Sequence, residues 1–330
     1  MYLRNKSGFS PGNASRLVCL ALLWILLGQS LNALAVTGVT LLVGEPSVAA
    51  NEFIEQLRVE LAQTSNAKLP LNVLSLDKLS ADKLSINTPT GDDSLVLAVG
   101  VQALSRASQL DSRVPVLGVL VPRPSYEKIL QDSKRNPRNF SAIVLDQPFF
   151  RQLALIKIIL PGTTSISALL GPTSRDSLAE LKRAANQQGL ALQQANVEVA
   201  SQLLPRLKQI LETSSVLLAV PDPLVYSRES VQPILLTTYR YQVPVIGFSQ
   251  AYVRAGALAA VYSTPRQIAR QIVEELMLFD SRPRNGFNAV QYPKYFSVDV
   301  NRQVAHSLGI ELGDENTLSE TLLRMERSMR

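Results

Sequence analysis

The chain has 330 residues, of which 46% are hydrophobic and 18% charged, as in an ordinary globular protein with room for two lobes. Its only cysteine is Cys19 and its only histidine is His306, so the usual zinc and transition-metal ligand sets cannot be assembled from one chain. Without residues 1–35, 30 basic and 27 acidic residues remain, which lowers the net charge from +6 to +3. This balance indicates no basic face for nucleic acid.

The N-terminus has the pattern of an export signal. Three basic residues precede an apolar run at 17–27, and small residues at 33–35 have the spacing that signal peptidase needs. Eleven apolar residues are far fewer than the roughly 20 that span a bilayer, so cleavage after Ala35 is favoured over an uncleaved anchor. Because Val18 stands before Cys19, lipid anchoring is not expected. The pattern predicts a periplasmic protein.

Short apolar runs then alternate with helical patterns, which is typical of parallel βαβ units covered on both faces of the sheet. In the first half, the segment 47–62 repeats apolar residues on one face and predicts a helix, and another helix begins near Ala103. The predicted strands of this half are 39–43, 71–76, 95–99 and 116–121.

The same pattern restarts at residue 143. The predicted helices are 149–160, 175–188, 203–212 and 230–239, and the predicted strands are 143–145, 166–170, 190–197, 216–220 and 243–247. The second half repeats the first as a unit of five strands, and two similar units favour two lobes over one sheet of about ten strands. The predicted fold class is therefore α/β, with two doubly wound, Rossmann-like lobes.

The stretch 243–276 contains two short apolar runs around a polar aromatic turn, followed by an amphipathic helix. Open parallel sheets bind ligands at the carboxyl ends of their strands, which makes Ser249, Gln250 and Tyr252 candidate ligand contacts. We expect the chain to cross from the second lobe to the first in this turn. It would then continue as a first-lobe strand at 256–262.

Short motifs in a fixed order carry a family resemblance over residues 140–310. They are Gln147-Pro148, Arg151-Gln152-Leu153, Leu160-Pro161, Leu170-Gly171-Pro172, Pro221-Asp222, residues 243–247, Gly256-Ala257-Leu258, Tyr262, residues 301–305 and Leu308-Gly309-Ile310. In these the chain resembles ABC-transporter substrate-binding proteins of the type I periplasmic-binding-protein fold, closest to the tryptophan- and tyrosine-binding branch. The resemblance implies two lobes joined by three hinge strands, with a small ligand enclosed between them.

The expected domains are a first lobe of residues 36–145 plus 250–285 and a second lobe of residues 146–249 plus 286–330. The resemblance implies a monomeric periplasmic receptor that delivers an amino acid or similar zwitterion to an ABC permease in the inner membrane. No cofactor and no catalytic residue is expected. An enzyme would have to use His306 as its base, and no G-x-S-x-G nucleophile elbow accompanies it.

Helix N-termini offer free N–H groups to a ligand carboxylate, whereas a ligand ammonium requires a carboxylate and aromatic faces. Turns that follow strands supply both kinds of group, and Tyr226 and Tyr262 supply further rings. The candidate ligand contacts are Glu45, Gly100, Gln102, Thr173, Ser174, Asp222, Tyr226, Ser249, Gln250, Tyr252 and Tyr262.

Several of these residues have structural alternatives. Thr173 and Ser174 could be plain helix caps, Asp222 could cap a turn or hold an amine, and the tyrosines could simply pack. Pro223 and Leu224 also stand where relatives commonly have polar residues. A periplasmic sensor or interaction protein with a degenerate cleft is therefore the second hypothesis for function.

Overall fold

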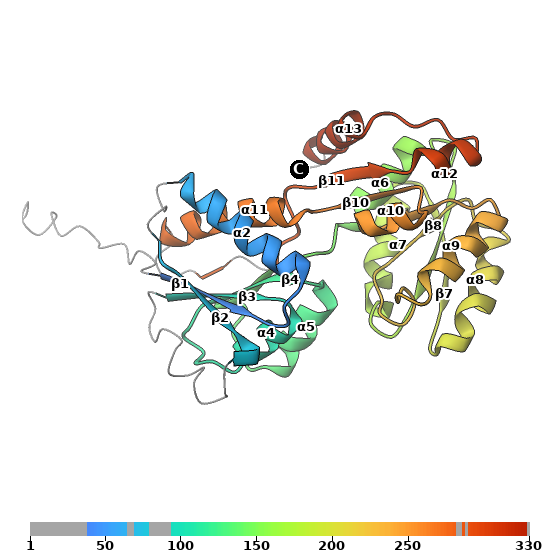
Figure 1. Cartoon of the computed structure of the whole chain (residues 1–330). Helices are drawn as coiled ribbons and strands as arrows, with labels where there is room; N and C mark the ends of the chain where they lie inside the picture. The colour runs from blue at the N-terminus through green and yellow to red at the C-terminus, as the bar shows by residue number, and fades with distance from the viewer. Residues whose placement is uncertain (1–37, 65–68, 79–93, 282–285, 288–289, 329–330) are drawn as a thin grey trace, which may run out of the picture.

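A computed structural model describes residues 38–64, 69–78, 94–281, 286–287 and 290–328. The predicted export signal lies outside these residues. The described chain forms two α/β lobes, each built around its own sheet (Figure 1). This arrangement confirms the predicted fold class.

The first lobe has a fully parallel sheet in the order β2-β1-β3-β4-β5. Successive residues of its strands pack on opposite faces, so that Leu41 belongs to the core beneath α2 and α11 and Leu42 to the core beneath α4. The strands are β1 Gly38–Val43, β2 Leu71–Ser75, β3 Ser94–Val99, β4 Val116–Val121 and β5 Phe140–Val144. The helices are α2 Val48–Ala62, α4 Val101–Ala107, α5 Arg123–Asp132 and α11 Pro265–Ser281.

The second lobe has a six-stranded sheet in the order β11-β10-β9-β8-β6-β7, parallel except that β11 runs antiparallel to β10. Its strands are β6 Ser165–Leu170, β7 Ala191–Asn196, β8 Leu217–Leu218, β9 Val245–Gly247, β10 Ala259–Tyr262 and β11 Ser297–Val300. Its helices are α6 Phe149–Ile159, α7 Leu178–Gln187, α8 Leu203–Leu211, α9 Val231–Arg240, α10 Gln250–Ala255, α12 Arg302–Ser307 and α13 Glu315–Ser328.

The predicted crossing in the turn at 249–252 is wrong. The short helix α10 ends at Gly256, whose φ of 125° suits only glycine, and the chain returns to the same sheet. There β10 pairs with β9, with Ala259 opposite Ile246. The chain crosses only after β10, and α11 then packs against α2 of the first lobe.

The boundary expected at residue 286 is also displaced. The Gln291 N–H donates to the carbonyl of Ala142, and the Val144 N–H donates to the carbonyl of Gln291. These bonds attach Gln291 to β5 of the first sheet. The return to the second lobe therefore comes after Tyr292, in the residues that precede β11.

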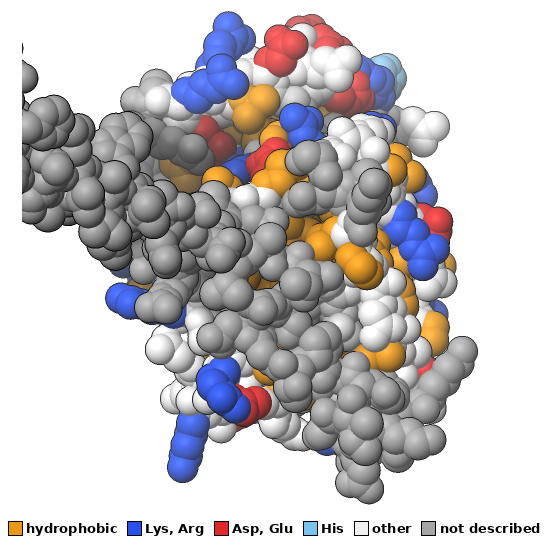
Figure 2. Space-filling model, turned by 90° about the vertical axis from the view of Figure 1, so that its left-hand side faces the viewer, with side chains coloured by type: hydrophobic (Ala, Val, Ile, Leu, Met, Phe, Trp, Pro, Cys, Tyr) orange, Lys and Arg blue, Asp and Glu red, His pale blue; other side chains and the backbone are white. Residues whose placement is uncertain are grey.

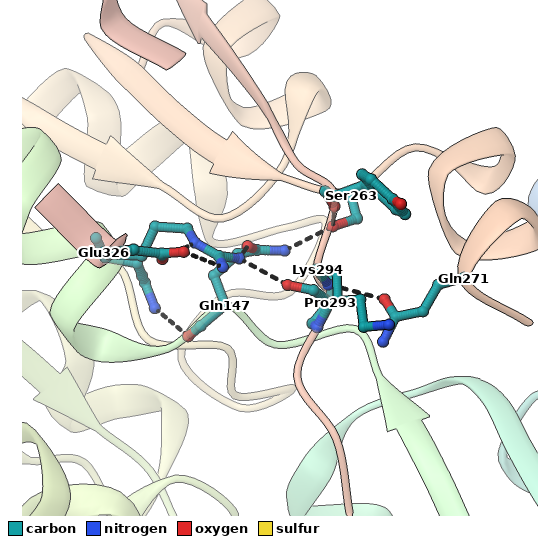
Figure 3. Close-up of polar contacts among 9 residues, drawn as sticks. Gln147, Ser263, Gln271, Pro293, Lys294 and Glu326 are labelled. Atoms are coloured by element: carbon teal, nitrogen blue, oxygen red, sulfur yellow. Dashed lines mark hydrogen bonds and ion pairs between the residues drawn. The ribbon is translucent and has the colours of Figure 1, made fainter. Parts of the chain in front are cut away.

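Three crossovers thus join the lobes, and hydrogen bonds tie all three together (Figure 3). Gln147, after β5, donates from Nε2 to the Oγ of Ser263, after β10, at 2.9 Å. Ser263 Oγ in turn donates to the carbonyl of Tyr295 in the third crossover at 2.6 Å. Gln271 of α11 accepts from the Lys294 N–H at 2.8 Å. The hinge is therefore a bonded unit rather than three independent strands.

A buried arginine organises this hinge. Arg151 of α6 has 3% of its side chain exposed, and its guanidinium donates to Gln147 Oε1 and, at 3.0 Å, to the carbonyl of Pro293. Its other nitrogens pair with both carboxylate oxygens of Glu326 on α13, the NH2 contact being 3.0 Å (Figure 3). The centroid of the Phe296 ring lies 4.2 Å from the guanidinium carbon of Arg151. Arg151 thereby connects two crossovers to the C-terminal helix.

On the face shown in Figure 2, the described residues intersperse basic, acidic and hydrophobic side chains. No helix within the described ranges is both long and apolar enough to cross a bilayer.

The hinge makes a prediction about stability. Replacing Arg151 by Met leaves the carboxylate of Glu326 and the amide oxygen of Gln147 without their donor. The free energy of unfolding should therefore fall by about 3 kcal/mol. Glu326→Gln keeps an acceptor and should cost only about 1 kcal/mol. Urea unfolding measures both, with the exposed Arg254→Met as control. Equal values for the two hinge variants would contradict the arrangement.

Candidate functional site

A cavity of about 940 Å³ lies between the two lobes, a size that accommodates a small-molecule ligand. Many of its wall residues closely follow strands, as expected for open parallel sheets, and others come from α5, α6 and α7. The first lobe contributes Pro122, Arg123, Leu145 and Asp146, and the second contributes Pro172, Thr173, Val220, Pro221, Phe248 and Ser249. The crossovers add Gln147, Ser263 and Tyr292 to the lining.

A charged cluster joins the lobes at this cavity. Arg123 of α5 donates to Glu180 of α7 in the other lobe at 2.6 Å and to Glu127 of its own helix at 2.7 Å. The Tyr292 hydroxyl donates to the second oxygen of Glu180 at 2.8 Å and also contacts the guanidinium of Arg123. Burial, assisted by Glu180, raises the pKa of Tyr292, so its phenol stays neutral. Two carboxylates and a phenol of the protein thus already pair with Arg123.

Asp146 follows β5 and is half-buried in the cavity wall. One of its oxygens accepts the backbone N–H of Arg123 at 2.6 Å. Burial raises the pKa of Asp146 above its ordinary value, more than this hydrogen bond lowers it. A carboxylate in such a position is poorly hydrated and gains from a cationic or N–H partner.

Two glutamines line the cavity beside Asp146. Gln147 bonds to Ser263 and Arg151 within the hinge, and Gln152 of α6 donates from Nε2 to the carbonyl of Gln147 at 2.9 Å. This bond fixes which end of the Gln152 amide is the acceptor. Its Oε1 is buried and has no hydrogen-bond partner among the described residues.

Asp222 lies behind the second-lobe wall with 4% exposure, and its carboxylate accepts five hydrogen bonds. The backbone N–H groups of Thr173 and Ser174 and the Ser174 hydroxyl donate to Oδ2 at 2.9–3.0 Å. The N–H groups of Leu224 and Val225 donate to Oδ1 at 2.9 and 3.3 Å. The Asp222 carboxylate thus caps the turns at 173–174 and 224–225. This is the structural alternative that the sequence left open for Asp222.

Gly171 explains how the carboxylate fits there. A Cβ at position 171 would lie 2.3 Å from an oxygen of Asp222, so only glycine leaves the space. Ser174 is buried as well, and its Oγ accepts the Gly171 N–H at 2.9 Å. Thr173, by contrast, is exposed and lines the cavity.

Two more of the predicted contacts lie at the cavity. Ser249 caps α10, since its Oγ accepts the Tyr252 N–H at 3.3 Å, and it also lines the cavity. Tyr262 ends β10 and lines the same space. Burial, followed by the nearby Asp299, raises the pKa of Tyr262 to about 12, so it presents a neutral phenol.

Tyr226 and Tyr252 are core residues of the second lobe, 8% and 5% exposed. Their rings meet edge to face at 5.9 Å between centroids, and Tyr252 contacts Phe248 at 4.7 Å. Because neither tyrosine is part of the cavity lining, their place is packing behind Phe248, which does line it.

The remaining candidates lie outside the cavity. In the first lobe Gln102 donates to Glu45 at 2.6 Å on the surface, and Gly100 caps α4 with a φ of 88°. Gln250 accepts from Arg254 at 2.6 Å on α10. The cavity therefore brings together Thr173, Ser249 and Tyr262, but not the first-lobe trio.

Sequence reasoning missed Arg123, Asp146, Gln152 and Glu180. The first two directly follow predicted strands, so the rule that selected Gly100 could have found them. Glu180 lies in mid-helix and becomes relevant only because the lobes face each other, which no local pattern shows. Among the described residues, no group of three or more His, Cys, Asp and Glu side chains could hold a metal ion.

The two parallel-sheet lobes, the three crossovers and the enclosed cavity define a two-lobed binding protein of the type I periplasmic-binding-protein fold. The chain belongs to the family of ABC transporter substrate binding proteins, whose model matches residues 90–317. This family consists of binding proteins rather than enzymes, which confirms the prediction that the protein is not an enzyme. Its members bind small molecules, usually work with ABC permeases and are typically periplasmic.

Solved structures share the fold at low sequence identity. An ABC domain in complex with L-Trp from Streptococcus pneumonia has a TM-score of 0.56 and 14% identity, covering 86% of this chain and 98% of that one. A ligand-free, open substrate-binding protein with adhesive properties from Clostridium difficile has a TM-score of 0.64 and 16% identity, covering 84% and 97%. A conserved domain protein from Vibrio cholerae has a TM-score of 0.58 and 20% identity, covering 86% and 98%. No curated protein matches the chain in sequence.

Replacing Asp222 by Ala should lower the free energy of unfolding by about 3 kcal/mol, because it leaves five donors without their shared acceptor. Asp222→Asn keeps one acceptor oxygen and should lose about half as much. Denaturant unfolding of the unliganded protein is the measurement. An unchanged Asp222→Ala protein would point away from the capping role and toward ligand binding.

Asp146 should impose a pH dependence on stability. Because its pKa is raised on folding, the folded protein holds this proton more tightly, and stability falls as pH rises from about 3.8 through the raised value. Asp146→Asn should remove that fall and leave the protein at least as stable at pH 7. Unfolding from pH 4 to 7 tests it, with Glu55→Gln as a surface control. A steeper slope in Asp146→Asn would refute the assignment.

Proposed function

We propose that this protein is the periplasmic solute receptor of an ABC importer and encloses a small ligand between its lobes. The observation that carries the proposal is the cavity between the two lobes, walled by strand ends from both and bordered by the bonded hinge. Family membership supports the same role.

The chemistry of the cavity suits reversible binding. Aromatic side chains such as Phe149, Phe248 and Tyr262 supply apolar surface, while Thr173 and Ser249 supply hydroxyls. Closing two lobes over such a site removes water from around the ligand, which strengthens each polar contact. No reacting group is needed for this work.

For the ligand, we propose an amino acid or a similar small zwitterion, held by a monomeric receptor. The support comes from mixed polar and aromatic walls and from the structurally related protein that holds L-Trp. The export signal expected at residues 1–35 would bring the receptor to the periplasm, where an inner-membrane permease could take up the ligand.

Native mass spectrometry of protein isolated from the periplasm of an expression host tests the receptor function. A bound small molecule should be seen, and adding it back at 100 times its dissociation constant should stabilise the emptied protein by about 2.7 kcal/mol. Solution scattering should also show a smaller radius of gyration on binding.

A protein that carries no small molecule and gains no stability from a broad metabolite collection would contradict the receptor function. That result would favour a periplasmic sensor or interaction protein with a degenerate cleft.

A further inference from the structure

We propose that the ligand is a cation, an amine without a carboxylate, whose ammonium group binds between Asp146 and Gln152. The inference rests on the proposed receptor function and replaces the zwitterion proposed above with a cation, so the two ligand classes are alternatives that the titration below separates. It is carried by an unused buried acceptor, by the charge of the cavity walls and by the two carboxylates that already pair with Arg123.

The unused acceptor is the amide oxygen of Gln152. This side chain lines the cavity and is 3% exposed, and its Nε2 is fixed by the carbonyl of Gln147. Its Oε1 has no partner among the described residues. A buried acceptor without a donor is unfavourable, so a turn of the amide that brings Oε1 to a ligand N–H in the cavity would be favourable.

The charge of the walls points the same way. Within the described lining, carboxylates outnumber cationic side chains: they are Glu127, Asp132, Asp146, Asp176 and Glu180, against Arg123 and Lys128. Asp132 and Asp176 lie exposed at the rim without a bonded partner among the described residues. Such a cleft attracts cations and repels anions before contact.

The two cationic side chains of the described lining, Arg123 and Lys128, are poorly placed to hold a ligand carboxylate. Arg123 already pairs with Glu180 and Glu127, and the phenol of Tyr292 contacts it as well. Lys128 lies exposed on α5 at the rim. A ligand carboxylate at Arg123 would be repelled by Glu127 and Glu180, which already pair with this guanidinium, whereas an ammonium would be attracted by them.

Asp146 and Gln152 lie next to the same crossover and line the same cavity. Gln152 bonds to the carbonyl of Gln147, the residue after Asp146, so both side chains flank the first crossover. The aromatic faces of Phe149 and Tyr262 line the same cavity and can take the apolar body or the cation itself. Carboxylate, amide oxygen and ring faces are the groups that hold an organic ammonium.

Calorimetric titration of the emptied full-length receptor with three matched series tests the ligand class. The series are tryptamine, tryptophan and indole-3-acetate; phenethylamine, phenylalanine and phenylacetate; and cadaverine, lysine and 6-aminohexanoate. In at least one series the compound without a carboxylate should bind at least tenfold more tightly than its carboxylated partners. If no such amine binds, or if carboxylated partners bind equally well throughout, the inference is wrong.

Variants locate the amine. Gln152→Leu removes the acceptor at similar volume and Asp146→Asn removes the charge, and each should weaken the best amine at least tenfold. Glu55→Gln, a carboxylate-to-amide change on the surface of α2, should leave its affinity unchanged. Unchanged affinity in both cavity variants would overturn the assignment, and melting curves of the unliganded variants verify their folding.

The two proposals fail differently. Binding of tryptophan or phenylacetate instead of amines leaves the receptor function standing and removes only the cation. Failure of every compound, together with the absence of any copurified molecule, removes the receptor function itself.

Discussion

The buried guanidinium of Arg151 is the constraint on which the two-lobe arrangement depends. A charge with 3% exposure is tolerated only because Gln147, the carbonyl of Pro293 and Glu326 surround it with acceptors. Those acceptors come from different crossovers and from the C-terminal helix. Satisfying one cation therefore holds the hinge together and sets the border of the cavity.

Polar residues that follow strands do two kinds of work in this fold. Asp222 and Ser174 turn inward and satisfy backbone N–H groups, so the turns around them are rigid. Asp146, which follows β5, and Gln152, which lies in the first turn of α6, instead line the cavity and retain capacity for further bonds. The cavity wall thus has two layers. Asp222 lies behind and stabilises the turns, whereas Asp146 and Gln152 lie in front, in the lining of the cavity.

The sequence alone predicted most strands of both lobes, where a short apolar run is bounded by turn residues, but it did not predict β11. It misplaced β10, since a six-residue helix ending at Gly256 can return the chain to the same sheet as easily as carry it across. It proposed Thr173, Ser249 and Tyr262, which do line the cavity, but also Tyr252, which packs in the core. The same turn supplies both kinds of residue, and side-chain direction depends on tertiary packing that no local pattern encodes.

The ion pair between Arg151 and Glu326 joins residues 175 positions apart in the chain. The first lobe depends on contacts of even longer range, because Arg266 of α11 pairs with Glu60 of α2, 206 positions away. The core of this lobe is therefore completed by a helix that follows most of the second lobe in the chain. Residues 38–144 on their own would lack that helix and would leave the apolar face of α2 uncovered.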